Sequence, residues 1–174
     1  MTSMDHMEVE DLPAISQTDF LDLLQAYLRH ETEKVERASR TGAGWEIWLQ
    51  VELYLFARWE THGDIQREKP YGGNTKGRTD FLLNDSQGKG RTLVEIKTRL
   101  SGEGAADFLK RVGGDFDKQT TAPKNTRTLV VGVWVGPDPQ KAISQPKKAI
   151  GSSEVVNITE VVPGRSYIVQ AGIA

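Results

Sequence analysis

The spacing of apolar residues predicts two helices in the first third of the chain. From Asp19 to about Arg37, apolar residues stand at positions 20, 23, 24, 27 and 28, which is the i, i+3, i+4 pattern of an amphipathic helix. Between Trp45 and Trp59 most positions are apolar, so we expect this second helix to be buried on several sides. The segment SRTGAG between them contains two glycines and separates the two helices.

Short runs of strand-forming residues follow the second helix. Three strands are expected over Asp64–Glu68, Thr79–Leu83 and Arg91–Thr98. Glycine-rich segments, KPYGGNTKG and NDSQGKG, join them as turns. This spacing is typical of strands that pair with their neighbours in sequence as an antiparallel meander.

The second half of the chain predicts one more helix and a central strand. A helix is expected over Ala105–Thr120, and the continuous apolar run Thr128–Val135 is typical of a strand covered on both faces. A short helix at Lys141–Ile150 and weak strands at 154–162 and 166–170 follow. The whole order predicts an α/β fold, with a mixed central β-sheet flanked by helices.

The length of 174 residues suits one domain with a helical extension. We assign residues 1–40 to an acidic N-terminal tail and helix, and residues 41–174 to the main domain. The extension is expected either to pack on that domain or to mediate dimerisation. No apolar run approaches the roughly 20 residues that cross a bilayer, and the polar N-terminus lacks a signal-peptide pattern. We therefore expect no membrane partner and a cytoplasmic location.

Composition excludes some chemistry and localises the charge. The chain has no cysteine, which excludes disulfides, thiolate metal sites and a cysteine nucleophile. The net charge is −2, yet the segment from Arg67 to Arg127 holds 13 basic and 8 acidic residues. A locally basic surface that attracts nucleic acid is one interpretation, and an ordinary solvated surface is the other.

The segment LVEIKT presents an acid and a base on one face of a predicted strand. Glu95 and Lys97 are two residues apart, so their side chains point the same way, while Val94 and Ile96 face the core. Asp80 lies in the preceding predicted strand, and pairing of these strands would bring Asp80 and Glu95 within about 5 Å. Alternatively, Glu95 and Lys97 form a surface pair and Asp80 is a turn residue.

Two neighbouring carboxylates repel each other unless a cation neutralises them. Mg²⁺ prefers oxygen ligands and retains several waters, so Asp80, Glu95 and the backbone carbonyl of Ile96 are a suitable ligand set. A fourth candidate, Glu52, stands alone among apolar residues on one predicted helix face, and an ionised carboxylate there needs a partner. The partner would be a metal, its bound water or a lysine; the alternatives are a buried salt bridge and a position at the edge of the helix. Glu46 lies about 120° away and is expected to be solvated.

Together these residues resemble the PD-(D/E)xK nuclease superfamily, the restriction-endonuclease-like fold. The matching stretches are WLQVELYLF with Glu52, GRTDFLL with Asp80, and LVEIKT with Glu95 and Lys97. The family has proline before the aspartate, where this chain has Thr79. The resemblance covers about residues 45–135 and implies an αβββαβ core preceded by the N-terminal helical extension.

The resemblance also implies a function, a metal-dependent endonuclease that hydrolyses phosphodiester bonds of DNA. Asp80, Glu95, Ile96 and Glu52 would bind Mg²⁺, with Mn²⁺ as a substitute, and Lys97 would orient the attacking water. A homodimer is a further expectation from such relatives, and RNA remains an alternative substrate. A catalytically inactive nuclease-like module for nucleic-acid binding or assembly is the alternative function.

Several polar residues around the predicted centre are weaker candidates. Arg78 and Lys76 flank the first glycine-rich turn and are candidates for phosphate contacts. The helix after the catalytic strand offers Asp115, Lys118 and Gln119, for which a solvated helix face is the alternative. The aromatic residues of the Trp45–Trp59 helix are expected to be core rather than a surface for stacking bases.

Overall fold

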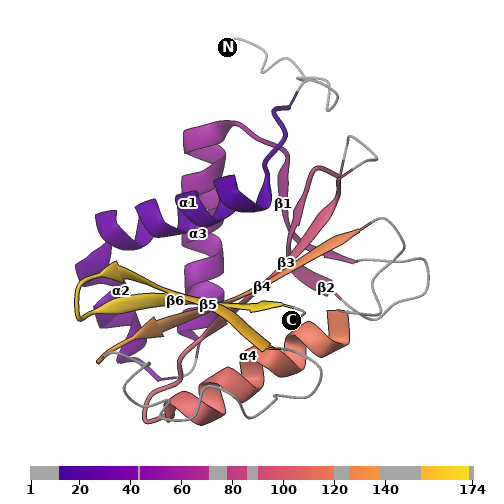
Figure 1. Ribbon diagram of the computed structural model, residues 1–174. Helices are drawn as coiled ribbons and strands as arrows, with labels where there is room; N and C mark the ends of the chain where they lie inside the picture. Colours follow the sequence, from indigo (N-terminus) through magenta and orange to yellow (C-terminus); the bar gives the residue numbers. More distant parts are fainter. Residues whose placement is uncertain are drawn as a thin grey trace.

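A computed structural model describes residues 12–42, 44–70, 78–85, 90–119, 126–137 and 154–172. In these residues six strands form one mixed sheet with helices on both faces, which confirms the predicted α/β class (Figure 1). The helices are α1 (Gln17–His30), α2 (Thr32–Ser39), α3 (Trp45–Thr61) and α4 (Ala105–Gln119). The strands are β1 (Ile65–Pro70), β2 (Arg78–Leu83), β3 (Thr92–Thr98), β4 (Arg127–Val135), β5 (Glu154–Val162) and β6 (Ser166–Gly172).

The strand order across the sheet is β1-β2-β3-β4-β6-β5. Strands β1, β2 and β3 form the expected antiparallel meander, and helix α4 then carries the chain across to β4, which is parallel to β3. Strand β6 pairs antiparallel with β4, and β5 forms the edge beyond it. The two strands predicted weakly near the end of the chain are therefore present as β5 and β6.

The predicted N-terminal helix is two helices rather than one. Ser16 caps α1 by accepting a hydrogen bond from the Asp19 backbone N–H, and the Asp19 side chain accepts from the Ser16 N–H in return. Helix α1 ends at Glu31, whose backbone conformation is not helical, and α2 begins at the next residue. The apolar periodicity ends at Leu28, so the sequence pattern does not show whether the polar segment beyond it continues the same helix or begins a new one.

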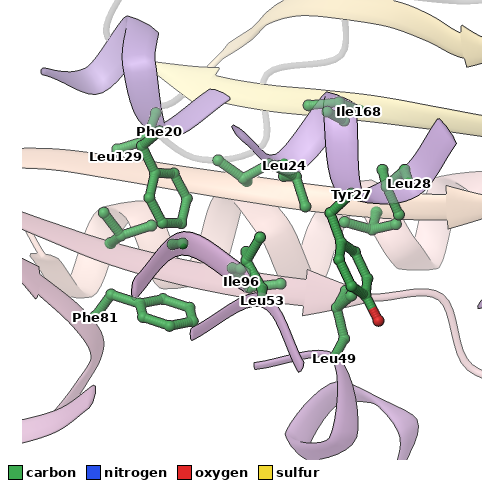
Figure 2. Close-up of a cluster of buried hydrophobic side chains, with 14 of the residues drawn as sticks. Phe20, Leu24, Tyr27, Leu28, Leu49, Leu53, Phe81, Ile96, Leu129 and Ile168 are labelled. Carbon is green, nitrogen blue, oxygen red and sulfur yellow. The ribbon is translucent and has the colours of Figure 1, made fainter. Parts of the chain in front are cut away.

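The larger hydrophobic cluster lies between the sheet and helices α1 and α3. Figure 2 shows side chains from α1, α3 and four strands interleaved in it. Phe20 of α1 packs against Phe81 of β2, with ring centroids 5.5 Å apart. Buried members include Phe20, Leu24, Tyr27, Leu28, Leu49, Leu53, Phe81, Ile96, Leu129 and Ile168. Helix α1 thus contributes directly to the main core.

The opposite face of the sheet is covered by α4 (Figure 1). Phe108 and Val112 of α4 are fully buried against Val130 and Trp134 of β4. Neighbouring residues of β4, Val131 and Val133 among them, belong to the first cluster instead. Strand β4 is therefore covered on both faces, as its continuous apolar run predicts.

The buried face of α3 differs from the predicted one. Trp45, Leu49, Leu53 and Ala57 are buried and face the core. Trp59, one of the aromatic residues that the sequence predicts to be core, is exposed, and so is Leu55. The helix is apolar on nearly every side, so the spacing of its apolar residues does not identify which side faces the core.

Two remaining expectations concern the tail and membranes. The predicted helix at Lys141–Ile150 lies outside the described residues. Among the helices of the described part, none has the length and apolar character required to cross a bilayer.

Candidate active site

Strands β2 and β3 present three of the predicted site residues on the same face of the sheet. Phe81 pairs with Val94 in the antiparallel register, and both side chains are buried in the larger cluster. Because side chains alternate along a strand, Asp80 and Glu95, one residue away from this pair, point to the α4 face. Lys97 lies two residues beyond Glu95 and shares that face. The predicted convergence of Asp80, Glu95 and Lys97 is thus present.

Asp80 is held against β3 by a hydrogen bond to its backbone. The Oδ2 atom accepts from the Ile96 backbone N–H at 2.7 Å, and the carboxyl group lies beside that of Glu95, the residue opposite it in the strand register. Burial raises the pKa of Asp80 above its ordinary value, and the nearby Glu46 carboxylate acts in the same direction. The Ile96 hydrogen bond and Lys97 oppose this rise without cancelling it. Two acidic groups therefore lie side by side where both are only partly exposed to water.

Lys97 is surrounded by carboxylates. Its Nζ atom lies 3.0 Å from Glu46 Oε1 and 3.2 Å from Asp115 Oδ2. Burial disfavours the ammonium charge, but Glu46, Asp115 and Asp80 outweigh it and raise the pKa of Lys97. The lysine is accordingly a fixed cation at neutral pH and not a proton acceptor.

The carboxylate that α3 supplies to this site is Glu46, not Glu52. Glu46 stands in the first turn of α3, where its Oε2 atom accepts from the Thr98 backbone N–H at 3.0 Å. The preceding residue, Trp45, donates from Nε1 to the Arg99 carbonyl at 2.7 Å. These contacts dock the beginning of α3 on the end of β3, so Glu46 extends past the strand to reach Lys97.

Glu52 lies elsewhere, which corrects its predicted position. Its Oε2 atom is 3.1 Å from Lys34 Nζ and 3.4 Å from the Tyr27 hydroxyl. Both partners belong to the N-terminal helices, so Glu52 joins α3 to them in a salt bridge. A salt bridge was one of the alternatives that the sequence left open for Glu52.

A second cation borders the centre. Arg111 of α4 donates to both oxygens of Glu103, at 2.7 and 2.9 Å, and to the Thr98 carbonyl at 2.5 Å. Its Nη1 atom is 4.0 Å from Glu46 Oε2. Burial disfavours the charge of Glu103, yet its hydrogen bonds to Arg111 and Leu100 prevail and lower the pKa of Glu103. Arg111 therefore fixes the loop that follows β3 beside the site.

We define the candidate centre as Glu46, Asp80, Glu95, Lys97 and Asp115. The centre combines four carboxyl groups with one lysine, so in fully ionised form it would carry an excess of three negative charges, because Arg111 is already paired with Glu103. Burying such an excess is costly, which agrees with the raised pKa of Asp80. A divalent cation is the simplest group that would neutralise it.

The residues fit a magnesium ion only if water completes its coordination. Within the described ranges, no three His, Cys, Asp or Glu side chains are grouped closely enough to hold a metal ion by themselves. Asp80 and Glu95 lie side by side, and the Ile96 N–H points at Asp80. In a strand the carbonyl of a residue points to the same neighbour as its N–H, so the Ile96 carbonyl faces β2 as well. Two carboxylates and one carbonyl suit Mg²⁺, which keeps several waters.

The weaker nucleic-acid candidates are only partly described. Arg78 is exposed beside the centre, with its Nη1 atom 4.0 Å from Glu68. Lys76 and the side chains of Lys118 and Gln119 lie outside the described residues. Asp115, from the same predicted helix, is at the centre rather than on a solvated face.

Sequence patterns gave no indication of an arginine-lined pocket next to the centre. The pocket has a volume of about 530 Å³ and lies where β3 and β4 end, beside α2 and the β5–β6 turn. Arg40, Arg99 and Arg165 line it, together with Glu36. The Arg99 guanidinium is fixed 4.1 Å above the Trp134 ring and donates to the Val135 carbonyl. We call this cavity the arginine pocket; its residues come from distant segments, so no local motif marks it.

No protein-family model, curated protein or solved structure matches this chain. The case for its function therefore depends on the geometry and chemistry of the centre.

Proposed function

We propose that the protein is a metal-dependent nuclease that hydrolyses phosphodiester bonds of DNA as an endonuclease. The observation that carries the proposal is the position of Asp80 and Glu95, which lie opposite each other on one face of β2 and β3, with the Lys97 ammonium ion beside them. The element order also supports it. A helix, a three-stranded meander, a helix and a parallel strand, α3 to β4, match the αβββαβ order of the restriction-endonuclease-like core.

Each residue of the candidate centre has a chemical role in this proposal. Asp80, Glu95 and the Ile96 carbonyl would hold Mg²⁺ or Mn²⁺, which when bound polarises the phosphate and lowers the pKa of water. Lys97 would orient the attacking water and offset the charge that develops on the phosphate. Glu46 and Asp115 fix the Lys97 ammonium, and we infer that Glu46 takes the helix position that the sequence assigned to Glu52.

The arginine pocket supports a polyanionic substrate. Arg40, Arg99 and Arg165 lie at the same end of the sheet as Lys97, since Arg99 is only two residues further along the chain. Guanidinium groups bind phosphate oxygens in a forked geometry. A nucleic-acid backbone that passes from the centre into this pocket would gain phosphate contacts on one side of the bond to be cut.

The test is cleavage of supercoiled plasmid, linear duplex DNA and RNA, each with Mg²⁺ and with EDTA. We expect Mg²⁺-dependent cleavage of both DNA forms, and a loss of roughly 100-fold or more in Asp80→Asn and Lys97→Ala. Lys110→Ala, an exposed lysine of α4, is the matched control and should retain full activity. Cleavage of linear DNA only from its ends would replace the endonuclease with an exonuclease, and cleavage of RNA alone would replace the substrate.

Two outcomes would reject the proposal itself. One is cleavage that persists in EDTA or survives both Asp80→Asn and Lys97→Ala. The other is nucleic-acid binding without cleavage under any divalent metal, which supports the inactive binding or assembly module.

A further inference from the structure

Helix α3 carries a row of exposed apolar side chains on the side away from the core. Ile47 is 60% exposed, Val51 36%, Leu55 59% and Trp59 80%. They follow one another at intervals of four residues, so they form one continuous ridge along the helix. We call these four residues the α3 stripe. A row of this kind on a protein surface marks an interaction site.

We propose that the α3 stripe is the interface through which two copies of this chain form a symmetric dimer. The inference stands apart from the proposed nuclease activity, because it concerns a surface and not the centre. It also differs from the sequence expectation of dimerisation through the N-terminal helix, since α1 is committed to the core of its own chain.

The stripe supplies most of the apolar area that a standard dimer interface needs. Taking about 150–200 Å² for a large side chain, the four exposed fractions amount to about 400 Å² of apolar surface per copy. Two copies would bury about 800 Å². A standard interface buries about 1,600 Å² in total, of which roughly 60% is apolar, so the stripe supplies most of the apolar part.

The shape of the stripe suits packing against itself. Ridges of residues four apart interlock when two helices cross at about 50°, and such helices are closest in the middle and diverge toward their ends. In a two-fold antiparallel pair, Val51 meets Leu55 of the other copy near the crossing, and Ile47 meets Trp59 at each end. The least exposed residue, Val51, thus lies where space is narrowest, and Trp59, the largest, lies where it widens.

The flanking charges favour an apolar partner over a charged one. Glu52 is paired with Lys34 at 3.1 Å, and Arg58 donates from Nη1 to the Gly63 carbonyl at 3.3 Å. The Glu52 carboxylate therefore has its countercharge within its own chain and does not call for a cation on the partner. A second copy of the same stripe meets this requirement.

The experiment measures the molar mass of the purified full chain by sedimentation or light scattering. We expect a particle of twice the chain mass of 19.3 kDa for the wild type. Leu55→Glu and Trp59→Glu should weaken self-association by roughly 30-fold or more, because they place charge in the interface. Leu100→Glu, at a residue 41% exposed and outside the stripe, is the matched control and should remain dimeric. Circular dichroism should show all three variants folded, since each substitution is at the surface.

Cross-linking tests the register, and the chain has no cysteine of its own to interfere. Val51→Cys and Leu55→Cys proteins, mixed and oxidised, should form a disulfide between the two proteins, whereas Leu100→Cys should not pair with either. A wild-type monomer at the highest soluble concentration would overturn the proposal and leave the stripe to another protein or to the chain's own N-terminal segment. A dimer that survives both Leu55→Glu and Trp59→Glu would overturn it as well.

Discussion

Replacing Glu46 with glutamine tests the central correction that the structure makes to the sequence-based site. The Glu46 carboxylate accepts two hydrogen bonds at 3.0 Å, one from the Lys97 ammonium and one from the Thr98 N–H. Both partners are donors, so the amide group of glutamine can satisfy only one and turns its own NH₂ toward the other. Hydrogen bonds to charged groups contribute about 1.5–3 kcal/mol each. Because Asp115 still holds Lys97, we expect a net loss of about 1–3 kcal/mol.

For a chain of this length such a loss lowers the melting temperature by roughly 2–12 °C, which calorimetry resolves. The effect on catalysis should be larger than the effect on stability. Lys97 would keep one carboxylate anchor instead of two, and misplacement of a catalytic group by about 1 Å can reduce the rate about 100-fold. The rate of plasmid cleavage under saturating Mg²⁺ measures this loss below the melting transition.

The matched control is Glu52→Gln, the same change six residues further along α3. Glu52 contacts Lys34 and Tyr27 and no residue of the candidate centre, so this variant should cleave at the wild-type rate. A Glu46→Gln protein as active as the wild type, beside a Glu52→Gln protein that has lost activity, would refute the assignment of Glu46. That result would support the sequence-based assignment of Glu52 to the active site instead.

Three further predictions concern packing, protonation and metal binding. Gly132→Ala would bring a Cβ within 2.6 Å of Phe108 and 2.8 Å of Val112, so it should lower the free energy of unfolding in denaturant by about 1–3 kcal/mol. In the control Gly114→Ala, in α4, the new Cβ meets nothing within 4 Å, and the free energy of unfolding should rise by about 0.5–1 kcal/mol. Burial raises the pKa of Asp80, so its contribution to stability is full below the unfolded pKa near 3.8 and is lost as pH rises through the folded pKa. Asp80→Asn should therefore lose less stability than the wild type as pH rises above about 4, and an identical pH profile would contradict this sign. Mg²⁺ should raise the melting temperature of the wild type but not of Asp80→Asn, and equal shifts would place the ion elsewhere.

The strands of this fold were predictable because each strand position has only two orientations. Val94 and Ile96 are apolar and buried, so Glu95 and Lys97 had to share the opposite face. Asp80 could then be placed with them from the register of a short hairpin alone. The break at Glu31 was not predictable in this way, because the polar residues beyond Leu28 carry no periodic signal that distinguishes one helix from two.

The contribution of α3 was beyond the reach of the same reasoning, because a helical wheel describes a helix seen end-on. It assigns a direction to each side chain but says nothing of where along the sheet the helix begins. Glu46 reaches Lys97 because Trp45 docks on the Arg99 carbonyl and sets the first turn of α3 against the end of β3. That contact joins residues 54 positions apart in the chain. The sequence also does not show that Leu55 and Trp59 are exposed. Residues that pack against a second protein have the same apolar pattern as residues that pack against their own sheet. If the α3 stripe is the dimer interface, the error in orienting α3 and the misplacement of Glu52 have one physical origin, an apolar helix that packs on two partners.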